Sequence, residues 1–402
     1  MNGKKCCNKK NPANALLKTP SAGAKSGAGT CSDVRVKPRV EHKHFQLYFE
    51  PERKKIPACD KNESKTLLIT GGAGFMGSNF IRFILSEYSN YKIVNLDKLT
   101  YAGNLENLAD VANNPNYTFI KGDIAKAEDV DKALAIHGGA DIIINYAAET
   151  HVDRSILDPK AFLFTDVIGT YTLLEAIRRG LAKKMVQIST DEVFGMAHNM
   201  DDEFIESSPF DPSSPYSASK AGGDHLCSAY FRTYGTPVII THSCNFYGQY
   251  QYPEKLISLA ITNLLEGKKV PVYGKGEQFR EWIYTEDHCR AIEAILHNGR
   301  IGEIYNIGSR QRFKNIDTVK IILKHLKKDE SQIEYVKDRP GHDFGYAVNP
   351  DKLMNELGWS ARVNFEDGLK ATVDWYKKNQ AWWKKIKSGE YLDYYKRQYE
   401  ER

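Results

Sequence analysis

Three glycines at a fixed spacing constrain the fold of this chain more than any other feature. Gly71, Gly74 and Gly77 follow a short apolar run, 66–69, and precede a stretch with helical patterning, 79–88. In a strand–turn–helix unit the first glycine makes the tight turn, the second lets the backbone approach a pyrophosphate, and the third allows close packing of the helix on the strand. A glycine triplet alone is weak evidence, so the pattern requires a matching arrangement in the rest of the chain.

Strand-like and helix-like segments alternate after this turn. The further strand candidates are residues 92–96, 117–120, 142–145, 185–188 and 238–241. Such alternation predicts an α/β fold, a Rossmann-type doubly wound parallel sheet. After about Gly248 the pattern becomes more broken, and we expect a smaller C-terminal substrate-binding lobe over the carboxyl edge of the sheet, where ligands bind in such folds. We predict that residues 64–248, with about 280–306, form the cofactor-binding domain, and that 249–279 and 307–402 form the lobe.

The first 63 residues differ in composition from the remainder. They carry 14 Lys or Arg against 6 Asp or Glu, and their richness in Asn, Pro, Gly and Ser predicts a disordered basic leader. The remainder is close to neutral and gives no indication of nucleic-acid binding. The chain has neither a long apolar run nor a secretory signal, and its seven cysteines show no metal-site spacing. We therefore expect a cytoplasmic protein with no metal and no membrane contact.

The acidic residue after the second strand candidate bears on the cofactor. Asp97 lies twenty residues after Gly77. A carboxylate at this position accepts hydrogen bonds from an adenosine ribose and repels a 2′-phosphate, so NAD is favoured over NADP. The neighbouring Lys98 weakens this preference. Asp123, after the third strand candidate, is placed to contact the adenine.

A tyrosine and a lysine are predicted to share one face of a helix. Tyr216 and Lys220 are four residues apart, which is one helical turn. A phenol with an ordinary pKa near 10 is a poor base at neutral pH, and a cation one helical turn away, together with the positively charged nicotinamide, lowers that pKa. We therefore predict that Tyr216 is a catalytic base, and that Lys220 lowers its pKa and binds the nicotinamide ribose.

A hydroxyl and two carboxyls follow the strand candidate 185–188. These residues are Thr190, Asp191 and Glu192. The hydroxyl is suited to hold a substrate oxygen. Two carboxyls held close together do not both ionise easily, so one remains an acid while the other acts as a base. Elimination of water requires that division.

Longer runs around these residues resemble a known family. The runs are 70–77, 96–105, 147–155, 189–192, 214–220, 252–257 and 338–343. They resemble the extended short-chain dehydrogenases/reductases and, more narrowly, the dTDP-glucose 4,6-dehydratases. The similarity extends from about Lys65 to the C-terminal end and leaves out the leader. It implies a homodimer, with an interface that includes helices near 172–179 and 218–234.

The resemblance also implies a reaction that leads to deoxysugars. Tyr216 would take the proton of the sugar's 4-hydroxyl, held by Thr190, while the C4 hydride moves to NAD. Glu192 would then remove the C5 proton and Asp191 would protonate the leaving C6 hydroxyl. The hydride would return to C6, which gives dTDP-4-keto-6-deoxyglucose and regenerates NAD.

The resemblance assigns further contacts position by position. For NAD, in addition to the glycines, Tyr216 and Lys220, they are Phe75, Met76, Asp97, Lys98, Leu99, Thr100, Asp123, Ile124, Ala147, Ala148 and Thr165. For the nucleotide sugar, in addition to Thr190, they are Thr150, Asn245, Lys255, Leu256, Pro271, Val272, Tyr273, Arg280, Asn306, Arg339 and His342. Three positions depart from the usual family pattern: Thr150 replaces a serine, Phe246 replaces an asparagine near the nicotinamide, and Gln249 replaces a proline.

Three alternative functions remain at this point. A UDP-glucose 4,6-dehydratase would differ only in the base, since thymine and uracil differ by one methyl group. A sugar-nucleotide 4-epimerase or a decarboxylase on the same fold would have no use for the adjacent Asp191 and Glu192. A non-catalytic NAD-binding sensor would not require the intact set of reacting residues.

Overall fold

The computed structural model describes residues 63–338, 341–388, 391 and 395. The chain divides into two units, Met1–Glu52 and Arg53–Arg402, and every described residue belongs to the second. The expected leader therefore lies outside the described residues, except for Glu63, which is exposed.

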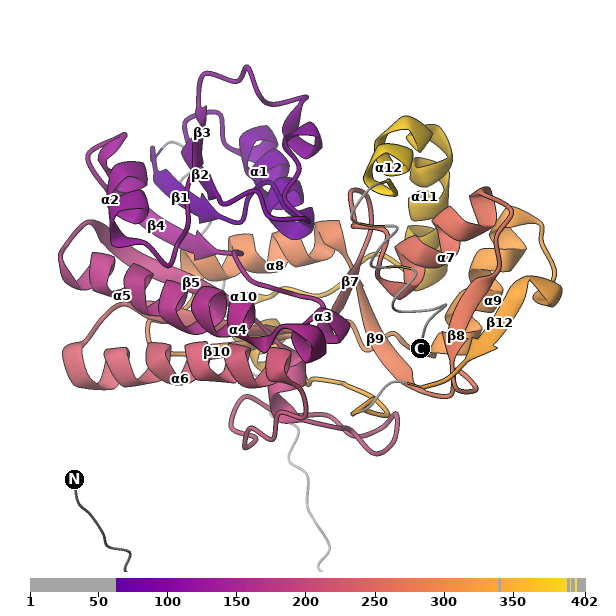
Figure 1. The fold of residues 1–402 in the computed structure, drawn as a ribbon. Coiled ribbons are helices and arrows are strands. Elements are labelled where there is room, and N and C mark those ends of the chain that lie inside the picture. Colours follow the sequence, from indigo (N-terminus) through magenta and orange to yellow (C-terminus); the bar gives the residue numbers. More distant parts are fainter. Residues whose placement is uncertain (1–62, 339–340, 389–390, 392–394, 396–402) are drawn as a thin grey trace, which may run out of the picture. The chain divides into compact units, whose positions relative to one another are not determined.

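Seven parallel strands form the main sheet of this unit (Figure 1), in the order β10-β6-β5-β4-β1-β2-β3. The bounds are β1 Thr66–Thr70, β2 Lys92–Asp97, β3 Tyr117–Lys121, β4 Ala140–Asn145, β5 Ala182–Thr190, β6 Val238–Ser243 and β10 Ile304–Ile307. The six strands expected from the sequence are confirmed, each longer by a few residues. The order reverses between β1 and β4, and a crevice at such a point is where ligands bind in this class of sheet.

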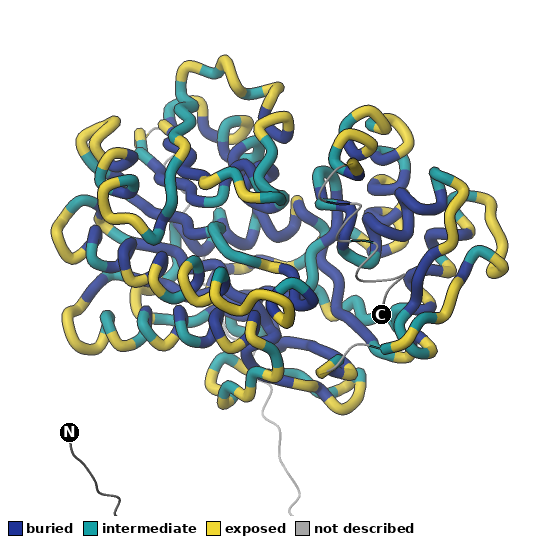
Figure 2. Tube along the Cα trace, viewed as in Figure 1, coloured by how far each residue is buried: buried dark blue, intermediate teal, exposed yellow. Residues whose placement is uncertain are grey.

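Helices cover both faces of the main sheet, and each face has its own apolar cluster. On one face lie α1 (Phe75–Glu87), α8 (Thr285–Asn298) and α10 (Asp351–Leu357). On the other lie α2 (Ala127–Ala135), α5 (Thr170–Arg178) and α6 (Pro215–Tyr234). Figure 2 shows the consequence: apart from the partly buried edge strand β3, the strands are mostly buried, whereas the outward faces of these helices are exposed. Burial on both faces explains why these strands are nearly continuous apolar runs.

Two short sheets lie outside the main sheet, with the strand orders β11-β9-β7 and β12-β8. Their bounds are β7 Asn245–Tyr247, β8 Val270–Tyr273, β9 Phe279–Tyr284, β11 Arg312–Lys314 and β12 Ile333–Val336. Strand β7 and most of β9 fall in the residue ranges predicted for the cofactor-binding domain, but β9 pairs with β11 of the smaller lobe. The lobe's helices are α7 Leu256–Leu265, α9 Asn315–Leu326, α11 Phe365–Lys378 and α12 Gln380–Ile386. A third apolar cluster joins these elements and includes the fully buried Trp383.

Short helical elements follow the strands at the carboxyl edge of the main sheet. They are α3 Val152–Leu157, α4 Pro159–Phe162, a π-helical segment Leu163–Gly169, and two 3-10 turns at Leu105–Leu108 and Asp191–Phe194, while a further 3-10 turn, Glu330–Gln332, precedes β12 in the smaller lobe. They place polar side chains above the ends of β4 and β5. None of the described helices has the length and apolar character needed to cross a membrane.

Candidate functional site

A pocket lies at the carboxyl edge of the main sheet and extends to the smaller lobe. Its lining includes nearly all residues that the sequence assigns to NAD: Gly71, Gly74, Phe75, Met76, Gly77, Asp97, Lys98, Thr100, Asp123, Ile124, Ala147, Ala148 and Thr165. From the substrate set it includes Thr150, Asn245, Lys255, Leu256, Pro271, Val272, Tyr273, Arg280 and His342. Thr190, Glu192, Tyr216 and Lys220 line the same pocket.

The glycine turn between β1 and α1 has the form that the spacing predicts. Gly71 has φ +66°, and a Cβ there would lie 2.6 Å from the backbone nitrogen of Ala147. A Cβ on Gly77 would lie 2.4 Å from the carbonyl oxygen of Gly71. Among the described residues, a Cβ on Gly74 would meet only that same oxygen, at 3.2 Å. Gly71 and Gly77 are therefore required by close packing, and Gly74 opens onto the pocket beside the first-turn amides of α1, which suits a pyrophosphate.

Two backbone amides fix the carboxylate of Asp97 at the end of β2. Its Oδ2 accepts from the amide of Ala73 at 2.9 Å, and its Oδ1 accepts from the amide of Leu99 at 2.7 Å. Burial raises the pKa of Asp97, and these two amides oppose that effect. Each oxygen keeps a further lone pair, so the carboxylate is positioned to accept from ribose hydroxyls.

The charge of Lys98 is directed to a different carboxylate. Its ammonium nitrogen lies 2.8 Å from Asp123 Oδ2. The repulsion between Asp97 and a 2′-phosphate is therefore not offset by a direct ion pair between the two neighbours. This arrangement fits NAD better than NADP.

Tyr216 and Lys220 lie in the first two turns of α6 and are both buried. Ser214 caps the helix in a capping box, and Pro215 occupies its first turn, which explains why the helix begins here. The ammonium of Lys220 donates to the carbonyl oxygen of Ile188 at 2.7 Å. Helix α6 thus places both side chains at the pocket, next to the carboxyl end of β5.

Lys220 by itself does not lower the pKa of the Tyr216 phenol. Burial raises the pKa of Tyr216 well above its ordinary value, and the carboxyls of Glu192 and Asp166 raise it further, while a hydrogen bond with Thr190 opposes them. Lys220 is held by the Ile188 carbonyl, and acidic side chains surround the phenol. The Tyr216 phenol therefore requires an additional positive charge in the pocket to act as a base.

The two adjacent carboxyls after β5 have different positions. Thr190 Oγ1 accepts from the amide of Glu192 at 3.3 Å and lies 3.2 Å from Asp191 Oδ1, to which it donates. Glu192 lines the pocket, whereas Asp191 lies outside the lining and is 1% exposed. Burial raises the pKa of Asp191 well above its ordinary value, as do the carboxyls of Glu192 and Glu281. The two neighbouring carboxyls therefore lie in different environments, and their assignment as acid and base stays a prediction.

The smaller lobe contributes cationic and aromatic side chains to the pocket. Arg280 on β9 donates to the carbonyl oxygen of Phe279 at 2.6 Å, and its guanidinium lies 4.5 Å from the ring centre of Tyr346. His342 Nδ1 lies 2.6 Å from Asp338 Oδ1. A guanidinium fixed in this way is well suited to pair with phosphate oxygens.

Two further contacts join the lobe to the loop after β4. Lys255 donates to the carbonyl oxygen of Thr150 at 2.6 Å. The hydroxyl of Tyr273 donates to Asp153 Oδ2 at 3.2 Å. Lys255 and Tyr273 are both predicted to bind the substrate. These contacts therefore hold two candidate substrate-binding residues next to the segment that follows β4.

Four predicted site residues are not among the lining residues. Asp191 lies behind Thr190, and Leu99 contributes its backbone to Asp97 as described. Asn306 on β10 donates to the carbonyl oxygen of Phe204 at 2.9 Å, and therefore holds the loop that follows β5. Arg339 lies outside the described residues.

Several pocket residues were missed by the sequence reasoning. Burial, together with the nearby carboxyl of Asp166, raises the pKa of Glu149 to about 7. Glu254 is buried between Tyr101 and Arg154, which donate to it at 3.0 and 3.1 Å. Glu149 and Glu254 lie within the runs 147–155 and 252–257, so the resemblance contained a signal for them. The burial of Asp166 had no such signal, since it depends on the π-helical segment.

Two of the three residues that depart from the family pattern make specific contacts in the structure. Phe246 lines the pocket and packs on His288, with ring centres 4.5 Å apart. Gln249 donates to Asn79 Oδ1 at 3.1 Å and accepts from Asn79 Nδ2 through its backbone carbonyl at 3.1 Å. Gln249 therefore ties the segment after β7 to the helix that follows the glycine turn.

The sequence and the fold match known proteins over most of their length. The family model described as GDP-mannose 4,6 dehydratase matches residues 68–372. A dTDP-glucose 4,6-dehydratase from Shigella flexneri is 46% identical over 360 residues, which covers 84% of this chain and 99% of the relative.

Solved structures give the same result. The dTDP-glucose 4,6-dehydratase from Bacillus anthracis, solved in complex with NAD, has a TM-score of 0.75 and 46% identity, covering 80% of this chain and 99% of that one. The enzyme of the same description from Streptomyces venezuelae has a TM-score of 0.76 and 47% identity at the same coverage. The chain therefore belongs to the extended short-chain dehydrogenases/reductases that act as nucleotide-sugar 4,6-dehydratases, within the group of dTDP-glucose 4,6-dehydratases.

Proposed function

We propose that this chain converts dTDP-glucose into dTDP-4-keto-6-deoxyglucose and water, with NAD regenerated in each turnover. One observation carries the proposal: a single pocket is lined by the dinucleotide turn, by Tyr216 and Lys220, and by Thr190 and Glu192, with Asp191 directly behind. An epimerase or a decarboxylase needs only the first two of these sets. Membership of the dehydratase group gives independent support.

The residues at the carboxyl edge fit NAD. The open space before Gly74, the first-turn amides of α1 and the carboxylate of Asp97 would hold the pyrophosphate and the adenosine ribose. Lys220 would bind the nicotinamide ribose. When bound, NAD supplies a positively charged ring that accepts a hydride from the sugar and gives it back.

The chain's own residues would move the protons. Thr190 holds the 4-hydroxyl, and Tyr216 removes its proton once a positive charge next to the phenol offsets the surrounding carboxyls. The resulting 4-ketone acidifies the C5 proton, which Glu192 removes. Asp191, kept protonated by burial, delivers a proton to the C6 hydroxyl, and water leaves.

The division of labour between the two parts of the unit is also a proposal. Residues 64–248 with about 280–306 would hold NAD, and 249–279 with 307–402 would hold the nucleotide sugar. Two features support it: β10 pairs with β6 in the main sheet, and β8 and β12 pair outside it. Arg280 and His342, with Arg339 outside the described residues, would contact the diphosphate.

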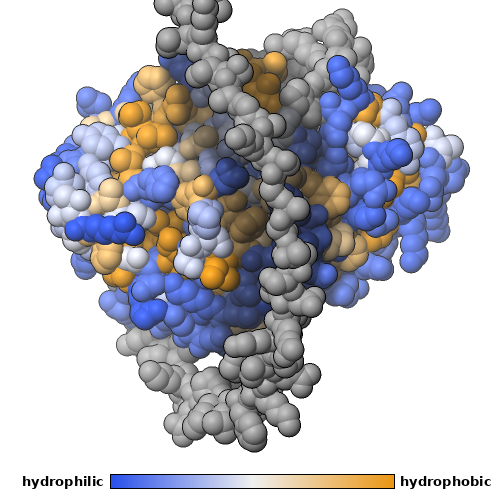
Figure 3. Space-filling model, turned by 90° about the horizontal axis from the view of Figure 1, so that it is seen from below, coloured by the Kyte–Doolittle hydropathy of each residue, from blue (hydrophilic) through white to orange (hydrophobic). Residues whose placement is uncertain are grey.

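We further infer a homodimer formed through the face of α3 to α6. Exposed apolar side chains gather there: Leu157 and Tyr234 are 60% and 58% exposed, and Leu163, Phe164 and Tyr171 accompany them. Figure 3 shows apolar side chains on the side of the unit that carries these helices. An exposed apolar patch of this kind is typical of a self-complementary interface. Light scattering of wild type and Phe164→Asp tests the inference, and a monomeric wild type contradicts it.

A cytoplasmic location is proposed on the basis of the cysteines. Cys227, Cys244 and Cys289 are buried free thiols. Buried thiols are stable in a reducing compartment.

The experiment that tests the proposed function is a parallel assay. The purified protein is incubated with dTDP-glucose and with UDP-glucose, and mass spectrometry follows the loss of one water from each. We expect the 4-keto product from dTDP-glucose at a higher kcat/KM than from UDP-glucose. Absence of product from dTDP-glucose contradicts the proposal, and a preference for UDP-glucose contradicts the assignment of the base.

A further inference from the structure

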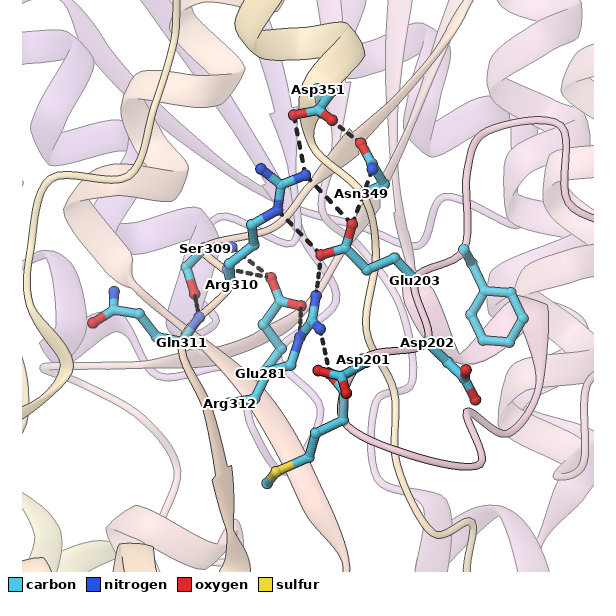
Figure 4. Close-up of polar contacts among 12 residues, drawn as sticks. Asp201, Asp202, Glu203, Glu281, Ser309, Arg310, Gln311, Arg312, Asn349 and Asp351 are labelled. Carbon is cyan, nitrogen blue, oxygen red and sulfur yellow. Dashed lines mark hydrogen bonds and ion pairs between the residues drawn. The ribbon is translucent and has the colours of Figure 1, made fainter. Parts of the chain in front are cut away.

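A network of charged side chains lies behind the pocket, next to β9 (Figure 4). At its centre is Glu281, which is fully buried. Its Oε1 accepts from the backbone amides of Ser309 and Arg310 at 2.6 and 2.8 Å, and its Oε2 accepts from Nε of Arg312 at 3.2 Å. Among the described residues, every partner of this carboxyl is an N–H donor, so the geometry suits an ionised carboxylate.

The rest of the network does not neutralise this charge completely. Arg312 also pairs with Glu203. Arg310 lies 3.1 Å from Glu203 and 3.0 Å from Asp351. Three carboxylates therefore share two guanidinium groups, which leaves a net negative charge next to the pocket.

The sheet topology places Glu281 close to the proposed general acid. The carboxylate contacts the residues directly after β10, since a Cβ on Gly308 would lie 2.6 Å from Glu281 Oε1. Strand β10 pairs with β6, and β6 pairs with β5, which ends immediately before Asp191. Adjacent strands are about 4.8 Å apart, so these two strand ends are separated by about 10 Å.

Charged and titratable groups from several elements surround Asp191. Glu192 and Glu281 raise its pKa and Arg280 lowers it. On α6 and after β6, the groups that interact with Asp191 are Tyr216 and Cys244, both of which are buried. Asp191 Oδ2 is itself buried and has no hydrogen-bond partner among the described residues. A protonated carboxyl is thus the form that this environment favours.

We propose that Glu281 is a positioning residue whose fixed negative charge keeps Asp191 protonated until the C6 hydroxyl departs. This inference rests on the proposed function and deepens it. Burial raises the pKa of Glu281, and the two backbone amides and Arg312 oppose that effect. The three N–H contacts favour the carboxylate form, which keeps the field at Asp191 negative. Removal of this charge therefore favours ionisation of Asp191, and the supply of the C6 proton fails at a lower pH.

The test compares the pH dependence of kcat with dTDP-glucose for wild type, Glu281→Gln and Glu203→Gln. Glu203 is a matched control, since it is a carboxyl of the same network that also binds Arg312. We expect the alkaline limb of Glu281→Gln to move to lower pH by about half a unit or more, and that of Glu203→Gln to move by less, because Glu281 is among the charges that raise the pKa of Asp191. NAD content and KM should remain within about twofold of wild type in both variants.

Two results overturn the proposal: an unmoved alkaline limb in folded Glu281→Gln, or an equal movement in Glu203→Gln. If Glu281→Gln does not fold, Glu281→Ala gives a second test, because it removes the same charge without placing an amide NH2 group next to the N–H donors of Ser309, Arg310 and Arg312. The limb should again move to lower pH, and a fixed or raised limb contradicts the inference. A wild type that forms no product from dTDP-glucose contradicts the proposed function, whereas an active wild type with unmoved limbs in the variants contradicts the role of Glu281 alone.

Discussion

Asp191 and Glu192 are neighbours in the sequence, yet only Glu192 lines the pocket, and Asp191 is buried behind Thr190. The 3-10 turn that follows β5 separates the two carboxyls. Under the proposed function, Glu192 would face the sugar as a base, whereas Asp191 lies in surroundings that favour its neutral form.

Replacement of the proposed C5 base should stop the reaction after its first half. In Glu192→Gln the sugar is still oxidised at C4, but the C5 proton is not removed and water is not lost. Near-ultraviolet absorbance should show reduced nicotinamide that persists, and mass spectrometry should show no loss of water. Normal turnover by this variant would show that Glu192 is not the base.

Removal of the Tyr216 hydroxyl should abolish the initial oxidation. We expect Tyr216→Phe to lower kcat by roughly 10²- to 10⁴-fold, since the proton acceptor is lost. Bound NAD, measured after denaturation of the purified protein, should remain at the wild-type level. Tyr335→Phe, an exposed tyrosine on β12, is the control and should retain wild-type activity; comparable losses in both variants contradict the role of Tyr216.

Two alanine substitutions in the glycine turn should have different effects. In Gly77→Ala the new Cβ meets backbone atoms at 2.4 and 2.7 Å, so the turn must shift, and thermal unfolding should show a loss of about 1–3 kcal/mol. In Gly74→Ala the Cβ meets only the carbonyl oxygen of Gly71, at 3.2 Å, so stability should fall by less than in Gly77→Ala while NAD affinity falls. Equal stability of the two variants would contradict the packing described for Gly77.

The pKa of Glu149 makes stability depend on pH. Burial and Asp166 raise this pKa from its ordinary value near 4.5 to about 7. A carboxyl whose pKa is raised on folding stabilises the protein fully below its unfolded pKa, and that contribution is lost as pH rises through about 7. Glu149→Gln should therefore gain stability relative to wild type between about pH 5 and pH 8, by at most about 3 kcal/mol.

Urea unfolding at about pH 5 and about pH 8 measures the difference in the free energy of unfolding between Glu149→Gln and wild type. Glu128→Gln, an exposed carboxyl on α2, is the control and should show no such trend. A constant difference between Glu149→Gln and wild type across this range would contradict the assigned pKa.

The sequence predicted the parts of the fold that depend on local pattern. Six strands and the glycine turn follow from apolar runs and from spacing, which are properties of short segments. The seventh strand, β10, was not singled out, because its four residues lie in a stretch of broken pattern. For the same reason, the strands of the smaller lobe were not singled out.

The electrostatics of the site could not be predicted in the same way. The pKa of Tyr216 depends on Asp166, fifty residues earlier, and on the way the π-helical segment turns that carboxyl inward. The role of Glu281 depends on the pairing of β5, β6 and β10. Such effects require the tertiary arrangement, whereas the approximate location of Tyr216, Lys220 and Glu192 required only the strand–helix order.

The central claim is that the cofactor, Tyr216 with Lys220, and the two carboxyls act on a single hexose. The most direct measurement uses dTDP-glucose deuterated at C4, with the product analysed by NMR. The account predicts that deuterium moves from C4 to C6 of the same sugar, because the hydride removed at C4 is returned within one pocket. Loss of the deuterium to solvent, or its retention at C4, would contradict the account.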